Sequence, residues 1–197
     1  PSVAGSINGS LTLENGSSLY ELDDTNGTLL VARMNLDGSL AWARTDGNRG
    51  GVAGRGVAAL ADGSCLVTGV FSGTVTFGLG DPGATTLTSA GGTDLFLTRY
   101  SATGELVWSR RAGGSTVGNA MMRVTGDRVE DFAAFPDGSC VLAGVFSIST
   151  SFGSGANRIV VPGASSYSTF VARYNPDGTG RWARGLSSTS GAYTRVA

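Results

Sequence analysis

Short apolar runs alternate along the chain with turns that contain glycine, and this pattern indicates antiparallel strands. Residues 95–100 form a run rich in β-branched and aromatic side chains, and a polar turn at 101–104 separates it from a run that contains a tryptophan and ends at an arginine. Residues 169–174 and the turn at 175–178 repeat this order. Runs of this length between turn residues are typical of β-strands. Each pair of runs joined by a turn therefore predicts a β-hairpin.

A second hairpin follows the first in each part of the chain. Residues 129–135 and 139–146 flank a Pro-Asp-Gly turn, and residues 56–60 and 64–71 flank an Ala-Asp-Gly turn. No long segment has the period of an amphipathic helix. The two hairpins together predict units of four strands.

Two longer segments separate the hairpins. Residues 74–90 and 149–165 are expected to be long connections, each with a Phe-Gly pair at which a strand should stop. Residues 159–161 have the composition of one further short edge strand.

Three tryptophans mark an internal repeat. Trp42, Trp108 and Trp182 follow one another at spacings of 66 and 74 residues, each at the same place in a similar string. An insertion of about nine residues around 121–130 accounts for the longer spacing. A regular period predicts stacked supersecondary units, and an insertion in one unit is usually a surface loop, often on a binding face.

The repeats predict one domain over residues 1–197. Its repeat equivalents are residues 29–94, residues 95–168, and a unit divided between residues 1–28 and 169–197. Residues 193–197 match residues 54–58, so the N-terminal strand would complete the last unit, or the chain is a fragment of a longer array. The start, which has no visible signal sequence, is interpreted as processed or partial.

Composition supports an all-β domain and excludes some partners. Of the 197 residues, 32 are glycine, 15% are charged and 41% are hydrophobic, which fits short strands joined by tight turns around a core. A net charge of −1 without a basic patch disfavours nucleic acid as a partner. The sequence contains no run of 18 apolar residues, so it predicts no membrane-spanning helix.

The repeated strings resemble those of a bacterial family. The segments 169–184, 136–147 and 74–94 are similar to SBBP-type β-propeller repeats, which are common in secreted proteins and lipoproteins of myxobacteria. The resemblance covers the whole chain and implies β-propeller-like blades, each a four-stranded antiparallel sheet. About three blade equivalents are fewer than the usual four to eight, so closure requires a partner chain, further blades, or a different ring such as a three-fold β-trefoil.

The repeated residues are best explained by folding. Cys65 and Cys140 occupy equivalent positions in different units, which predicts buried free thiols rather than a disulfide, and two thiols without histidine make a zinc site unfavourable. The tryptophans are expected to pack between blades, with sugar stacking as the alternative. The predicted structural core of the repeat is Trp42, Trp108, Trp182, Phe71, Phe146, Cys65 and Cys140.

Each tryptophan is followed two positions later by an arginine on the same strand face. We expect Arg44, Arg110 and Arg184 to pair with turn carboxylates or carbonyls, and an anion site is the alternative.

Acidic residues near turns offer only a weak calcium hypothesis. Asn35-x-Asp37-Gly38 and Asn175-x-Asp177-Gly178 lack the further acidic ligands of a calcium loop and are interpreted as hairpin turns. A second acidic group belongs to one copy only, where a solvated loop is favoured over a calcium site: Glu21, Asp23 and Asp24.

The inserted loop is the preferred binding candidate because it belongs to one copy. Two adjacent methionines offer an adaptable surface and the charged residues offer polar anchors. The residues are Met121, Met122, Arg123, Asp127 and Arg128.

Catalysis has little support in the sequence. Without histidine there is no Ser-His-Asp or Cys-His arrangement, and no phosphate-binding loop is present. Glu130 and Asp131 are adjacent and should point to opposite strand faces, which does not fit a paired-carboxylate glycosidase. We therefore expect no enzyme and no required cofactor.

The sequence favours a non-enzymatic extracellular or cell-surface scaffold. Its expected role is protein–protein interaction or assembly with a protein partner or with further copies of the repeat, because unpaired strand edges invite pairing with another chain. A lectin-like glycan-binding module is the alternative, and a hydrolase or lyase fragment is the third.

Overall fold

The computed structural model describes residues 2–15, 18–47, 51–114, 126–146, 149–153, 157–163 and 168–186, with side chains from residue 28 onward. The regular elements in these ranges are β-strands. Within them, no helix has the length and apolarity that crossing a membrane requires.

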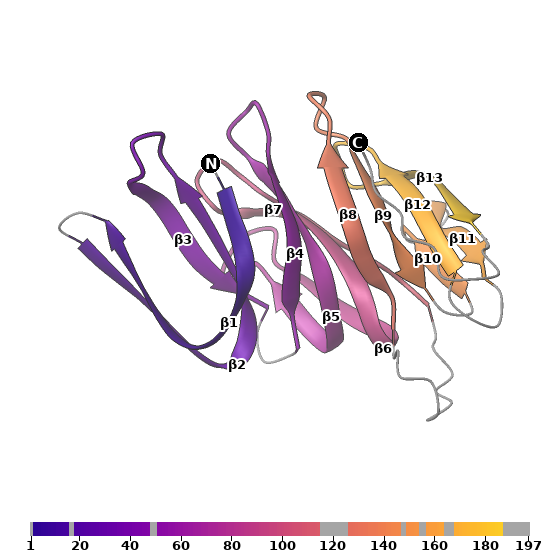
Figure 1. The fold of residues 1–197 in the computed structure, drawn as a ribbon, viewed down its shortest axis with the longest axis horizontal. Helices are drawn as coiled ribbons and strands as arrows, with labels where there is room; N and C mark the ends of the chain where they lie inside the picture. The colour runs from indigo at the N-terminus through magenta and orange to yellow at the C-terminus, as the bar shows by residue number, and fades with distance from the viewer. Residues whose placement is uncertain are drawn as a thin grey trace.

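Three antiparallel sheets lie side by side, with sheet A at the indigo end and sheet C at the yellow end of the colour scale (Figure 1). Sheet A consists of β1 (Ser2–Asn15), β2 (Ser18–Met34) and β3 (Leu40–Asp46). Sheet B contains β4 (Ala53–Ala59), β5 (Cys65–Phe77), β6 (Thr85–Tyr100) and β7 (Leu106–Gly113), with β10 (Ser149–Phe152) and β11 (Ile159–Pro162) added beyond β7. Sheet C contains β8 (Arg128–Ala134), β9 (Cys140–Phe146), β12 (Ser168–Tyr174) and β13 (Gly180–Leu186).

The predicted all-β class and the four-stranded antiparallel blade are confirmed. Strands β4 to β7 form one such blade, and β8, β9, β12 and β13 form the next in the same order. The register repeats as well, because Trp42, Trp108 and Trp182 each lie opposite an arginine of the neighbouring strand. The predicted repeat units start at residues 29 and 95, whereas sheets B and C start at β4 and β8. Each predicted unit therefore contains the end of one sheet and the beginning of the next.

The segments expected to be long connections are hairpins instead. Residues 74–77 of β5 pair with residues 85–88 of β6, and β10 pairs with β11. The expectation was wrong because apolar and polar residues alternate there, with Val75 and Phe77 fully buried. The predicted stops at the Phe-Gly pairs and the strand at 159–161 are confirmed. Strand β10 also pairs with β7, so a segment between two strands of sheet C completes sheet B.

Five hairpin turns in the described chain share one hydrogen-bond pattern. In each, the first N–H donates to the carbonyl four residues later and the glycine N–H donates to the first carbonyl. The glycines have φ values from 78° to 90°. The turns span residues 35–39, 60–64, 101–105, 135–139 and 175–179. The interpretation of the two Asn-x-Asp-Gly strings as hairpin turns is therefore confirmed.

Aspartate side chains hold four of these turns. Asp37, Asp62, Asp137 and Asp177 each accept hydrogen bonds from the N–H and the hydroxyl of the Ser or Thr two residues later. These bonds to the charged carboxylate lower the pKa of each aspartate. In the fifth turn, the Ser101 hydroxyl accepts the N–H groups of Thr103 and Glu105.

The apolar core is divided between the two junctions of the sheets. One cluster joins sheets A and B around Leu29, Phe77 and Phe96, and the other joins sheets B and C around Phe152 and Phe170. The predicted core residues Phe71, Phe146, Cys65 and Cys140 are at most 1% exposed. Both cysteines are free, as the sequence predicts, and burial raises the pKa of the Cys140 thiol to about 12.

A tryptophan of one sheet packs beneath a hairpin turn of the next. A Cβ added to Gly104 would lie 2.9 Å from the Trp42 ring, and one added to Gly178 would lie 2.9 Å from the Trp108 ring. Trp108 is 8% exposed, and Trp42 and Trp182 are partly buried. At Trp42 and Trp108, packing between blades therefore accounts for the ring without a sugar ligand.

We predict that Gly178→Ala destabilises the fold more than Gly80→Ala. Both glycines have positive φ, so each alanine costs about 1–2 kcal/mol. Space around Gly80 is open, whereas the methyl group added in Gly178→Ala would press on Trp108 and add about 1–3 kcal/mol. Urea denaturation monitored by tryptophan fluorescence measures both. Equal losses would contradict a close tryptophan–turn contact.

Candidate functional site

The structure describes only part of the predicted binding loop. Met121, Met122 and Arg123 lie outside the described residues. Arg128 is exposed at the start of β8 and forms an ion pair with Glu130.

Asp127 is a buried structural residue, contrary to its expected place on an exposed loop. It is 1% exposed. Its N–H donates to the Thr93 carbonyl at 2.9 Å, and its carboxylate accepts the Thr150 hydroxyl at 2.8 Å. Both partners are distant in sequence, so local patterning gave no signal of this role.

The acidic group of the weak calcium hypothesis lies on a strand rather than in the expected loop. Glu21, Asp23 and Asp24 belong to β2 and are paired with β1. The hairpin is an extension of strands β1 and β2, which are paired from Ser2 to Asn15 and contribute to sheet A. Their side chains lie outside the described part.

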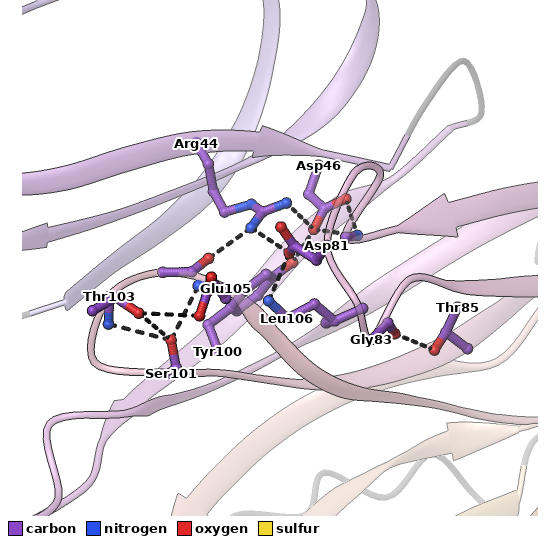
Figure 2. Close-up of polar contacts among 12 residues, drawn as sticks. Arg44, Asp46, Asp81, Gly83, Thr85, Tyr100, Ser101, Thr103, Glu105 and Leu106 are labelled. Atoms are coloured by element: carbon purple, nitrogen blue, oxygen red, sulfur yellow. Dashed lines mark hydrogen bonds and ion pairs between the residues drawn. The ribbon is translucent and has the colours of Figure 1, made fainter.

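A polar cluster joins sheet A to sheet B, with Arg44 at its centre (Figure 2). The Arg44 guanidinium donates to the Asp81 carboxylate at 2.7 Å and to the Gly104 carbonyl at 2.6 Å. It also lies 3.6 Å from the Asp46 carboxylate and over the Tyr100 ring, 5.4 Å from the centroid. The predicted pairing of this arginine with carboxylates and a turn carbonyl is therefore found at Arg44.

Asp46 is the most enclosed charged group of this cluster. Its side chain is 2% exposed. Its carboxylate accepts the N–H groups of Gly47 and Gly78 and the Tyr100 hydroxyl, with distances of 2.8 to 2.9 Å. Burial raises the pKa of Asp46 despite these donors and Arg44, and burial together with Asp46 raises the pKa of Tyr100 well above its ordinary value.

Asp81 closes the cluster from the loop after β5. Its carboxylate accepts the Leu106 N–H at 2.7 Å in addition to Arg44. Asp46 and Asp81 thus accept donors from sheets A and B, and the Asp46 side chain is almost fully buried. The arrangement joins two blades through donors and acceptors of the protein itself.

This cluster belongs to one copy of the repeat, and the sequence analysis did not identify it. Counted from the tryptophans, Ala112 and Leu186 stand where Asp46 stands in sheet A. Asp46 is charged at a position that is apolar in the other two copies, and this difference in the sequence could have indicated the cluster. Arg110 instead donates to the Asp177 carbonyl at 3.2 Å, and Arg184 donates to the Ala183 carbonyl at 3.1 Å.

A second contact occurs in the same form at both junctions between sheets. The Ala102 carbonyl, in a turn of sheet B, accepts Trp42 Nε1 at 2.9 Å and an Arg33 nitrogen at 3.3 Å. The Pro176 carbonyl, in the corresponding turn of sheet C, accepts Trp108 Nε1 at 3.3 Å and Arg99 at 3.2 Å. We call this pairing of a tryptophan and an arginine with one turn carbonyl the blade contact.

The two ends of the described array carry the separate halves of the blade contact. Sheet C has Trp182 and Arg173 in the register of the donors, and the described chain contains no following blade. Sheet A has Leu36 at the acceptor position of its turn, and this residue is 100% exposed. A Cβ added to Gly38 of the same turn would meet no atom within 4 Å.

One protein-family model matches the chain. It is described as "Domain of unknown function (DUF5122) beta-propeller" and covers residues 157–180, from the end of the loop before β11 to the first residue of β13. No curated protein matches the chain. The match supports a β-propeller repeat family, in agreement with the stacked antiparallel sheets, two of which contain a four-stranded blade.

We predict that Asp46→Asn removes a pH dependence of stability. Because the folded pKa is raised above the ordinary 3.8, protonated Asp46 stabilises the fold below that value and this contribution is lost as pH rises through the folded pKa. Asparagine does not titrate, so the variant gains stability relative to the wild type as pH rises. The turn aspartates are common to both proteins and cancel in the comparison.

Urea denaturation of both proteins at pH values from about 3 to 7 measures this difference. A wild type that instead gains on the variant with rising pH would mean that Arg44 and the hydrogen bonds outweigh burial.

Proposed function

We propose that the chain is a non-enzymatic β-propeller scaffold that assembles head to tail with a second copy of itself. The unmatched halves of the blade contact carry this proposal. Trp182 and Arg173 at the end of sheet C would donate to the Leu36 carbonyl of another copy, as Trp42, Trp108 and their arginines do within the chain.

The number of sheets supports a pair of copies. Two copies with three sheets each supply six blades, within the usual range of about four to eight for a closed propeller. Head-to-tail contacts produce a ring when the rotation closes. Sheet A also lacks, among the described residues, a strand in the place that β4 and β8 occupy, and its edge is therefore open to pairing.

The absence of histidine and the enclosure of the acidic cluster support a non-enzymatic role. Asp46 is inaccessible, and Asp81 is held by Arg44 and the Leu106 N–H. Sugar stacking on the tryptophans, which was the sequence basis of the lectin alternative, loses support where Trp42 and Trp108 are covered by turns.

We further infer that the repeats are of the SBBP type and that the protein works outside the cell or at its surface. The resemblance of the repeated strings supports this placement. Protease treatment of intact cells that produce the protein should degrade it while a cytoplasmic marker survives. Protection of the protein until the cells are lysed would contradict the placement.

The native mass of the purified chain tests the assembly. We expect a mass near twice the 19.9 kDa of one chain by light scattering. Gly38→Asn should reduce it to one chain, because its side chain would fill the space that the partner's tryptophan needs, whereas asparagine tolerates positive φ in the isolated turn. Gly80→Asn is the matched control, since Gly80 also has positive φ and open surroundings.

A wild-type mass of one chain at micromolar concentration would overturn the proposal. A Gly38→Asn protein that keeps the higher mass would show that the copies meet elsewhere and would also overturn it.

A further inference from the structure

A groove with a volume of about 800 Å³ lies at the junction of sheets B and C. Its walls come from residues 85–88 of β6, from β7, from the loop between β10 and β11, and from the turn before β13. Three arginines line it, together with hydroxyls that include Thr86 and Thr179. No acidic or aromatic side chain belongs to the described lining.

The groove occupies the position that the polar cluster around Arg44 occupies at the preceding junction. Its charged lining residues are arginines, whereas the cluster has two aspartates and one arginine. There, Arg44 is neutralised by Asp46 and Asp81. In the sequence of the next repeat, Ala112 stands in place of Asp46, and Ala156 follows its Phe-Gly pair at the spacing at which Asp81 follows the first pair.

Two further arginines of the groove are specific to this copy. Arg111 stands where sheet A has Thr45, and Arg158 precedes β11 where Ala84 precedes residues 85–88 of β6. Compared with the first junction, this position thus lacks two acids and carries two further arginines, one of which, Arg111, is paired with Asp94.

Two of the arginines are held in place by the fold. Arg110 lies over the Trp108 ring, 5.5 Å from its centroid, and donates to the Asp177 carbonyl at 3.2 Å. Arg111 donates to the Asp94 carboxylate at 2.8 Å and to the Thr88 carbonyl at 3.3 Å. Groups held in this way lose little conformational entropy when a ligand binds.

Among the described residues, Arg110 and Arg158 are the arginines of the groove that form no ion pair. Asp94 is 0% exposed and neutralises Arg111 from behind. The nearby Asp177 carboxylate is engaged by the N–H and hydroxyl of Thr179. Arg158 is exposed, and within the described chain it has no ion pair.

We propose that this groove binds an anionic oligosaccharide. Arginine guanidinium groups recognise carboxylate and sulfate groups through paired N–H donors, and the threonine and serine hydroxyls match the hydroxyls of sugar rings. A groove of this volume accommodates a ligand of several rings. The described lining lacks the aromatic platform on which single-stranded nucleic acids stack, so a glycan is favoured over an oligonucleotide. This activity is separate from assembly through the blade contact.

Calorimetric titration of the full chain with four hexamers tests the proposal. The ligands are a heparin-derived hexasaccharide with sulfates, an oligogalacturonate with carboxylates, neutral maltohexaose, and a single-stranded hexanucleotide. We expect binding of at least one anionic sugar, no binding of maltohexaose, and affinity that falls with added salt. The first two ligands distinguish sulfate from carboxylate recognition.

Arg158→Ala should weaken binding of the anionic sugar about tenfold, as expected for the loss of a charge-assisted hydrogen bond. Arg55→Ala is the matched control, because Arg55 is exposed on β4, outside the groove lining, and carries the same charge. Arg158 is exposed, so the variant should keep the unfolding temperature and native mass of the wild type.

Three results would overturn the proposal. No binding of either anionic sugar would exclude the ligand class. Equal weakening by Arg158→Ala and Arg55→Ala would mean that binding depends on overall charge rather than on this groove. Tighter binding of the hexanucleotide, with the same dependence on Arg158, would assign the groove to nucleic acid.

Discussion

The stacking of the sheets depends on a backbone carbonyl in a hairpin turn, which accepts hydrogen bonds from a tryptophan and an arginine of the preceding sheet. The contact occurs at Ala102 and at Pro176 with the same donors. It requires a turn without a Cβ above the indole, so a large residue on one sheet and a glycine on the next are coupled. Each sheet carries the tryptophan and arginine donors on one side and the turn carbonyl on the other. Repeating the contact therefore adds each new blade to the same side of the previous one.

The two junctions between sheets have the same geometry but different charges. Between sheets A and B, Arg44 is enclosed by carboxylates and a tyrosine, and the junction is filled. Between sheets B and C, the equivalent arginine has no such partners, and a groove with two further arginines remains open. The apolar clusters and the tryptophan contact are similar at both places, so a change of a few polar residues alters the surface without altering the stack.

Local chemistry made much of the fold predictable from the sequence. The Asp-Gly turns, the Trp-bearing strands and the Phe-Gly stops are decided by residues close together in the chain, and the structure has them where they were expected. Long-range pairings were not predictable. The attachment of β10 to β7, the hydrogen bond from Thr150 to the buried Asp127 and the bond from Arg44 to Asp81 join residues 23 to 40 positions apart. The groove was likewise missed, because its arginines come together only when two sheets meet.

The hairpin of β10 and β11 has a consequence for the order in which the molecule forms. It pairs with the last two residues of β7, yet it lies in the chain after the first hairpin of sheet C. During synthesis from the N-terminus, sheet B therefore waits with an open edge until the first half of the following sheet has emerged. An open edge is a template for pairing with other chains. The interval between the synthesis of Gly113 and that of Pro162 is thus a period in which the end of β7 can mispair with another chain, and it closes when the β10–β11 hairpin of the same chain pairs with that end.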